Sequence, residues 1–172
     1  MNAEGTSFKR EMLATLPSLR AFAVSLTGKH DKADDLVQDC LERAISRRGL
    51  FRPSGPMRPW LFTILVNLHR NARRSEQRRG PHLDADSLPE LGTPAPQHSH
   101  LALAELSRAI DGLPLEQKET LLLVTLEGMA YAEAASILDI PLGTLMSRLG
   151  RARANLRLST GETQEPHLRS VK

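Results

Sequence analysis

The sequence predicts an all-α protein of two small helical domains joined by a flexible linker, the second domain containing a helix-turn-helix. Apolar residues recur at intervals of three and four along most of the chain, which is the spacing of a buried helix face. Hydrophobic residues make up 40% of the chain but aromatic residues only 3%, so Leu and Ala must fill the core, and these favour helix over sheet. A stretch rich in proline divides the chain into residues 8–79, a linker at 80–100, residues 101–158 and a polar tail at 159–172.

The first helix is expected over residues 8–27. Its apolar side chains repeat at helical spacing: Phe8, Met12, Leu16, Leu19, Ala23 and Leu26. Pro17 conflicts with this pattern, because proline inside a helix removes a hydrogen bond and clashes with the preceding turn. The helix therefore either kinks at Pro17 or begins there, and Gly28 is expected to end it.

The second helix is expected to begin at Asp31, as its N-cap, and to carry acids on its outer face. The inward positions are Leu36, Val37, Cys40, Leu41 and Ala44, and the outward ones are Asp35, Gln38, Asp39, Glu42 and Arg43. Favourable interaction with the helix dipole explains acids in the first turn but not Asp39 and Glu42, which lie beyond it. A face that docks a basic partner is the alternative, and the residues alone favour neither.

A basic helix with aromatic neighbours follows a loop at residues 49–59. The helix is expected over residues 60–77, with polar and basic side chains on or near one face: Asn67, Arg70, Asn71, Arg73 and Arg74. Trp60 and Phe62 stand beside this run, and aromatic rings beside arginines suit single-stranded nucleic acid. A tryptophan at the start of a helix is also a common core anchor, so Trp60 has two interpretations.

Residues 131–157 predict a helix-turn-helix whose second helix is basic. Helices are expected at 101–112 and 115–127 before it, and Pro141 interrupts the apolar pattern between helices at 131–138 and 142–157. Thr144, Ser147 and Arg148 open the second helix, where side chains reach base edges in a major groove, whereas Arg151, Arg153 and Arg157 are placed for phosphates. The alternative is a solvated helix face.

The remaining features exclude several classes of protein. The single cysteine, Cys40, rules out an internal disulfide and lies on an apolar face, which indicates a packed thiol. His82, His98 and His100 have no cysteine partners and fit no usual metal spacing. The sequence has no phosphate-binding glycine loop, no recognisable catalytic spacing, no signal peptide and no apolar run of membrane-spanning length. We therefore expect a cytoplasmic protein without cofactor, metal or membrane insertion.

Taken together, the chain resembles the extracytoplasmic-function sigma factors of bacterial RNA polymerase. Three linked stretches, in the order and separation typical of that family, carry the resemblance: residues 33–39 with Arg43 and Ala44, residues 59–62 continuing through Asn67 to Arg74, and residues 140–145 with 147–149 and 151–153. Two positions depart from the family pattern. Leu41 stands where an aromatic residue is common, and Met146 where a basic residue often lies, which affects the expected promoter preference.

The resemblance implies a role for each charged surface. The acidic helix would dock on the clamp helices of the largest polymerase subunit through Asp34, Asp35, Gln38, Asp39 and Arg43. The loop and basic helix would recognise and open the promoter element near the start site through Arg52, Arg58, Trp60, Asn67, Arg70, Asn71, Arg73 and Arg74. The second unit would read the upstream element through Thr144, Ser147, Arg148, Arg151 and Arg153.

The implied partners are core RNA polymerase, including its β flap, promoter DNA and an anti-sigma protein. The polymerase would perform all the chemistry, and a role in stress response is expected. Two other functions stay open at this point. A sigma-like decoy would bind only the anti-sigma protein, but it has no need of the basic helix. A stand-alone repressor would leave the acidic helix without a purpose.

Overall fold

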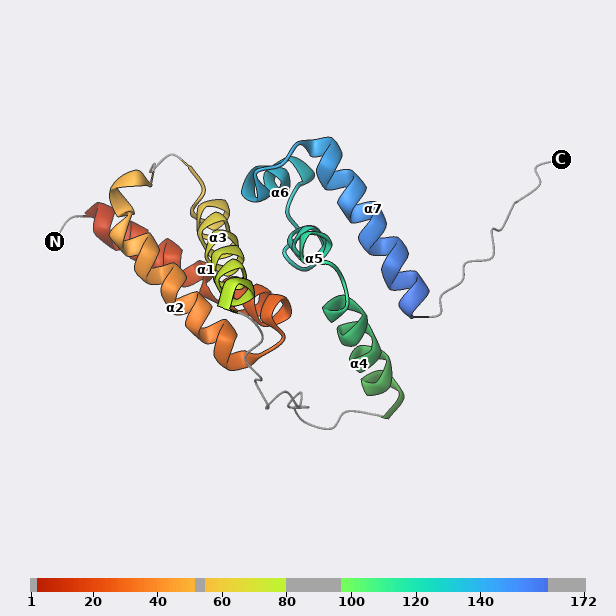
Figure 1. Cartoon of the computed structure of the whole chain (residues 1–172). Helices are drawn as coiled ribbons and strands as arrows, with labels where there is room; N and C mark the ends of the chain where they lie inside the picture. Colours follow the sequence, from red (N-terminus) through yellow and green to blue (C-terminus); the bar gives the residue numbers. More distant parts are fainter. Residues whose placement is uncertain (1–2, 52–54, 80–96, 161–172) are drawn as a thin grey trace.

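The computed structural model describes residues 3–51, 55–79 and 97–160, and all regular elements within these ranges are helical. They are, in order, α1 (Ala3–Thr27), α2 (His30–Ser46), the 3₁₀ helix η1 (Arg48–Leu50), α3 (Met57–Arg79), α4 (Gln97–Asp111), α5 (Leu115–Leu121), the π-helical turn η2 (Leu122–Leu126), α6 (Tyr131–Leu138) and α7 (Leu142–Ser159). Helices α1 to α3 form one group and α4 to α7 a second (Figure 1). This confirms the predicted all-α class.

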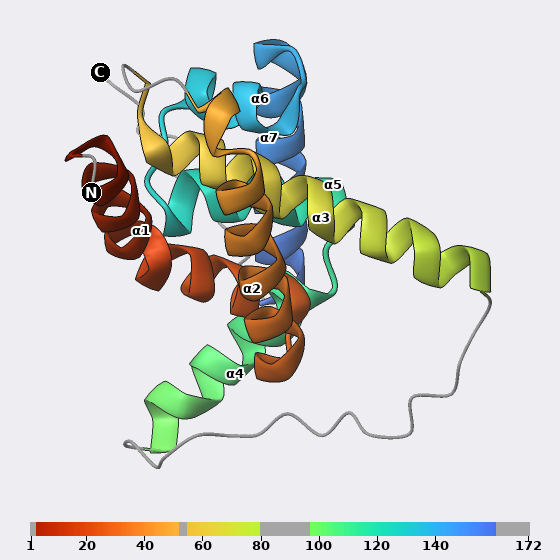
Figure 2. The same ribbon diagram turned by 90° about the vertical axis from the view of Figure 1, so that its left-hand side faces the viewer.

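Helix α1 runs through Pro17 without interruption. Of the two possibilities the sequence left open, the helix therefore does not begin at Pro17, and Figure 2 shows it changing direction partway along its length. The burial of Phe8 and Met12 explains why the helix forms before the proline, since both side chains pack into the core. Gly28, at φ 71°, ends the helix as predicted.

Helix α2 begins at His30, and its N-cap lies two residues before Asp31, the predicted N-cap. Lys29 takes the N-cap position without a side-chain capping bond, and Asp31 lies in the first turn. Asp34, farther along the helix, binds Arg20 on α1 through its carboxylate. The predicted inward face is correct: Leu36, Val37, Cys40 and Ala44 are buried and Leu41 is half-buried.

Helix α3 is longer than predicted at its start, because it takes in Met57, Arg58 and Pro59. Proline is tolerated there, since the first turn of a helix has no intrahelical acceptor for its N–H groups. At its other end α3 extends well beyond the helices that pack against its first half (Figure 2). The basic residues near that end are consequently open to solvent on more than one side.

The helix predicted at 115–127 is α5 followed by the π-helical turn η2. The Glu127 N–H donates to the Leu122 carbonyl five residues back, the signature of a π-turn, and Gly128 at φ 62° ends the element. Helix α4 begins at Gln97, inside the segment expected to be linker, while residues 80–96 lie outside the described ranges.

One hydrophobic cluster runs through both groups of helices. Phe22, Phe62 and Leu65 from the first group and Leu123 and Leu138 from the second are fully buried in it. Direct packing of α3 on α6 and of α1 on η2 makes the connection. The sequence indicated two units and left open whether they pack against each other. A smaller cluster, around Leu113 and Leu149, lies within the second group.

No helix in the described portion is long and apolar enough to cross a membrane. The buried thiol of Cys40 donates to the Leu61 carbonyl at 3.4 Å, and burial raises the pKa of Cys40 to about 12. The prediction of a packed, unreactive cysteine is therefore confirmed.

Candidate nucleic-acid interface and acidic docking face

The acidic face of α2 lies on the surface. Asp35, Asp39 and Arg43 are exposed and carry no ion pair with any described residue, and the Gln38 amide donates to Glu42 at 3.0 Å. Asp34 is also exposed, but Arg20 binds it through two hydrogen bonds of 2.6 and 3.0 Å, which lower the pKa of Asp34. The helix therefore presents Asp35 and Asp39, one turn apart, as open negative charges.

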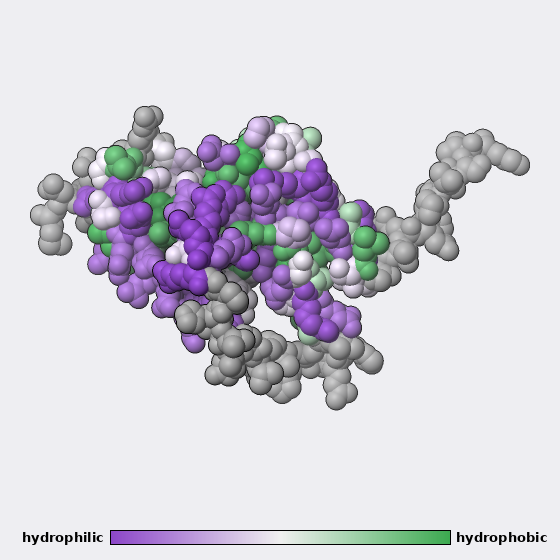
Figure 3. Space-filling model, viewed as in Figure 1, coloured by the Kyte–Doolittle hydropathy of each residue, from purple (hydrophilic) through white to green (hydrophobic). Residues whose placement is uncertain are grey.

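The candidate residues for the promoter element near the start site fall into two sets: side chains that are exposed to solvent and arginines that are bound by carboxylates. Asn67, Asn71, Arg73 and Arg74 are exposed on α3, where hydrophilic side chains cover the surface (Figure 3). Arg58 and Arg70, on the same helix, are instead held by carboxylates of the second group. Arg52 lies outside the described residues.

Trp60 packs within an aromatic cluster. Its ring centroid is 5.2 Å from that of Phe51 and 6.2 Å from that of Phe8, and the residue is half-buried. In this conformation the ring anchors the start of α3 against α1, which matches the second of the two interpretations offered by the sequence.

The helix-turn-helix consists of α6, a tight turn and α7. Asp139 adopts the left-handed conformation, at φ 54°, and Pro141 is the N-cap of α7. Leu145 and Leu149 bury one face of α7, which leaves Ser147, Arg151 and Arg153 exposed and Thr144 half-buried on the other. Arg148 is also half-buried: its side chain is 19% exposed and its Nη2 lies 2.8 Å from Glu116 Oε2.

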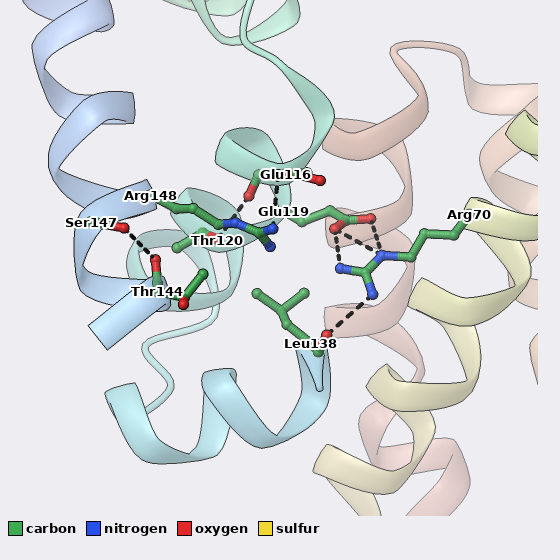
Figure 4. Close-up of polar contacts among 8 residues, drawn as sticks. All are labelled: Arg70, Glu116, Glu119, Thr120, Leu138, Thr144, Ser147 and Arg148. Carbon is green, nitrogen blue, oxygen red and sulfur yellow. Dashed lines mark hydrogen bonds and ion pairs between the residues drawn. The ribbon is translucent and has the colours of Figure 1, made fainter. Parts of the chain in front are cut away.

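A groove of about 540 Å³ brings the two basic helices together. Its walls come from α3 and from α5 to α7, and the arginines that face it are Arg70, Arg73, Arg74 and Arg148. Figure 4 shows Arg70 and Arg148 reaching toward α5 from opposite sides, each bonded to a different glutamate. Residues assigned to two separate promoter elements thus line one groove.

Sequence reasoning missed the carboxylates that hold these arginines. Glu119 is fully buried and Glu127 nearly so. One signal was available for Glu119, since it precedes Leu122 by three residues and Leu123 by four, on the apolar face of its helix. An acid at a core position needs a buried cationic partner. Burial raises the pKa of Glu119, and the bonds from Arg70 oppose that shift.

Within the described ranges, no group of three or more His, Cys, Asp and Glu residues is placed to hold a metal ion. Of the three histidines considered as metal ligands, His82 lies outside these ranges, and the side chains of His98 and His100 are not described.

Comparison with protein families finds two matches, one in each group of helices. Residues 12–66 match the family described as the Sigma2 domain of PhyR, and residues 103–156 match Sigma-70, region 4.

Two curated relatives resemble most of the chain. The ECF RNA polymerase sigma factor EcfG of Rhodopseudomonas palustris is 43% identical over 150 residues, which are 87% of this chain and 83% of the relative. The ECF RNA polymerase sigma-E factor of Escherichia coli K12 is 32% identical over 135 residues, 69% of each chain.

A solved structure has the same arrangement. The sigma factor RpoE of Bartonella quintana, crystallised with the anti-sigma factor NepR, superposes with a TM-score of 0.78 at 36% sequence identity, over 92% of this chain and 99% of that one.

Proposed function

The chain belongs to the extracytoplasmic-function sigma factors of bacterial RNA polymerase, and we propose that its acidic and basic surfaces carry separate parts of that function. As a sigma factor, it directs core RNA polymerase to promoters and assists transcription initiation. In this proposal residues 8–79 dock on the polymerase and open the element near the start site, and residues 101–158 read the upstream element. Sigma factors are not enzymes in general, and the polymerase performs the chemistry.

The polymerase docks on α2. The observation that supports this is the pair of exposed carboxylates at Asp35 and Asp39. The arginines proposed to bind DNA lie on other helices, α3 and α7. A surface with unpaired like charges favours a partner of opposite charge. Asp34, Gln38 and Arg43 complete the docking face, and the basic partner is the clamp-helix region of the largest subunit.

Charge reversal tests this assignment. Asp35→Arg together with Asp39→Arg should abolish co-purification with core polymerase, and both residues are exposed, so the fold should survive. Glu105→Arg with Glu133→Arg makes the same change in net charge on the other group of helices and should leave co-purification intact. Retention of polymerase by the α2 variant would contradict the docking face.

Helix α7 reads bases and α3 holds backbone. Arg148, with Thr144 and Ser147, opens the helix that a helix-turn-helix places in the major groove, while Arg151 and Arg153 lie farther along for phosphates. On α3, Arg73 and Arg74 are exposed beside Asn67 and Asn71 and suit the displaced strand. Arg52, Arg58, Trp60 and Arg70 belong to the same proposed surface.

Two alanine variants distinguish base recognition by α7 from backbone binding by α3, and each is assayed as holoenzyme. Arg148→Ala should lower discrimination between the cognate and a scrambled upstream element by about 1–3 kcal/mol, the worth of a bidentate base contact. Arg73→Ala should weaken binding to both sequences alike and reduce the slope of log K against log salt by about 0.7, the value for one phosphate of a single strand. Identical behaviour of the two variants on scrambled DNA would overturn the division.

The same proposal includes a cytoplasmic location and regulation by an anti-sigma protein. The support for the regulator is that the matched Bartonella sigma factor, which resembles this chain over nearly its whole length, was crystallised with an anti-sigma factor. Copurification of an anti-sigma protein with this chain from its own host, and loss of transcription when that protein is added to purified holoenzyme, are the expected results.

A decoy role is the second candidate, because residues 12–66 match a domain named for PhyR, and PhyR of Bartonella quintana is an anti-anti-sigma factor that was crystallised with NepR. The PhyR structure is only 19% identical and this chain covers 49% of it, which supports the fold alone. The 43% identity to a sigma factor over 87% of the chain favours the first role. Run-off transcription with purified core polymerase on a pool of promoter fragments decides between them: a decoy yields no product.

A further inference from the structure

Two arginines of the proposed promoter surface are bound by glutamates from the other group of helices. Arg58 Nη2 lies 2.6 Å from Glu127 Oε2 and also donates to the Glu127 carbonyl at 2.7 Å. Arg70 donates from Nε and Nη2 to both oxygens of Glu119, at 2.6 to 3.1 Å, and from Nη1 to the Leu138 carbonyl at 3.2 Å. We refer to Glu119 and Glu127 as the carboxylate clamp.

The carboxylate clamp satisfies the arginines in the way DNA would. A guanidinium binds a carboxylate and a phosphate with the same two-pronged geometry. Arg70, whose Nε and Nη2 both bind Glu119, therefore has no fork left for a phosphate, while Arg58 is held through Nη2 alone. Arg70 uses all three of its nitrogens on the second group (Figure 4). The clamp therefore competes directly with nucleic acid for these side chains.

Burial makes the contact more than an incidental surface pair. The side chain of Glu119 is 0% exposed and that of Glu127 is 4% exposed, and Arg70 is only 22% exposed. Exposed ion pairs contribute little, whereas breaking a buried pair leaves a desolvated charge without a partner. The two groups also share a hydrophobic cluster, so separating them exposes apolar surface as well.

We propose that the carboxylate clamp closes the free protein on its own promoter-binding arginines, and that DNA gains access to them only when the two groups of helices separate. This inference rests on the proposed function. The docking face of α2 stays exposed in the closed form, since Asp35 and Asp39 take no part in the contact. Core polymerase can therefore bind the closed protein, and opening follows as a later step of assembly.

The test compares two full-length double variants without polymerase. Glu119→Gln with Glu127→Gln removes the clamp charges but keeps the side-chain shape. Glu105→Gln with Glu133→Gln removes two charges from the same group of helices outside the contact, and so corrects for the general gain in DNA affinity. Fluorescence anisotropy with a labelled duplex carrying a promoter gives the affinity, and small-angle X-ray scattering gives the radius of gyration.

The clamp variant should bind the duplex at least tenfold more tightly than the control variant and should have a larger radius of gyration. Its slope of log K against log salt should be steeper by about 2, because two more arginines then displace counterions. Equal affinity and equal size in the two variants would overturn the proposal. An expanded variant with unchanged affinity would also overturn it, because release of the arginines would then not matter for DNA.

Two further measurements guard against ambiguity. If circular dichroism shows that the double variant has lost helix, Glu127→Gln alone, at the edge of the contact, should still raise affinity above that of Glu105→Gln, and no increase would refute the clamp. Run-off transcription by the unaltered protein with core polymerase is measured in parallel. Failure of transcription counts against the proposed function, whereas normal transcription with no effect of the clamp variants counts against the clamp alone.

Discussion

At the scale of single residues, His69 is a buried titratable group with an orphaned atom. It lies on α3 at 6% exposure, and its Nδ1 has no hydrogen-bond partner among the described residues. Burial lowers the pKa of His69 to about 4, with smaller contributions from the cations Arg73, Lys118 and Arg70 and an opposing one from Glu76. The imidazole is therefore neutral at physiological pH.

Acid should destabilise the protein through this histidine. Because its pKa falls from 6.5 in the unfolded chain to about 4 in the fold, the unfolded state binds more protons between these values. The stability that His69 contributes is present above pH 6.5 and is lost as the pH falls toward 4, up to about 3 kcal/mol. Urea unfolding at a series of pH values should show this loss.

His69→Gln should flatten the pH dependence of the free energy of unfolding between pH 6.5 and 4. His30→Gln, at an exposed histidine, is the control and should leave that dependence unchanged. A variant at His69 that still loses stability as steeply as the original would show that other groups account for the acid sensitivity.

At the scale of elements, the turn between α6 and α7 depends on one unusual residue. Asp139 has φ 54° and ψ 52°, a conformation that costs most residues free energy and that glycine adopts freely. Its N–H still bonds to the Ser136 carbonyl, which ends α6. This single left-handed residue sets the angle at which α7 leaves the turn.

The effect of a substitution at Asp139 on the free energy of unfolding should therefore depend on how easily the new residue adopts a left-handed conformation. Asp139→Val should cost about 1–3 kcal/mol, because a β-branched side chain clashes in the left-handed region, whereas Asp139→Gly should cost less than about 1 kcal/mol. Midpoints of urea unfolding measure both. Ser136→Val, at an exposed position in the preceding helix, should cost only a fraction of the Asp139→Val effect; equal costs at the two positions would argue against strain in the turn.

The sequence predicted the helices well and their ends less well. Periodicity identified the inward residues of α1 and α2, because a repeat of three or four reports which face of a helix is buried. It did not place the start of α2, because Asp31, the predicted N-cap, lies in the first turn and Lys29 takes the N-cap position without a side-chain bond. It also could not show that Arg58 and Arg70 meet Glu127 and Glu119, because a pattern within one helix contains no information about which other helix lies opposite.

At the scale of the whole molecule, a shared hydrophobic cluster joins the two groups of helices that the sequence predicted as two domains. Leu123 of η2 is fully buried in the same cluster as Phe22 of α1 and Phe62 of α3. A substitution that destabilises one group of helices should therefore also destabilise the other. Trp60, the single tryptophan, reports on the first group of helices from its place beside Phe51.

Unfolding in urea should consequently be a single transition. The midpoint from Trp60 emission should coincide with the midpoint from far-ultraviolet circular dichroism, which reports on all helices. Leu123→Ala should destabilise the protein by about 2–5 kcal/mol and should lower the Trp60 midpoint, although it lies on the other group of helices. Leu158→Ala, at a largely exposed position, is the control. Two separated transitions would show that the groups fold independently.

The separate placement of the acidic face and the occupied arginines has a consequence for how the protein searches a cell. A basic protein with all its arginines open would be trapped on the bulk of the chromosome, whose phosphates vastly outnumber any promoter. This chain instead keeps Arg58 and Arg70 bound to its own carboxylates while Asp35 and Asp39 face outward. If α2 is the docking face, fewer arginines are free to bind non-promoter phosphates before polymerase is bound, which favours arrival at the genome as part of the holoenzyme.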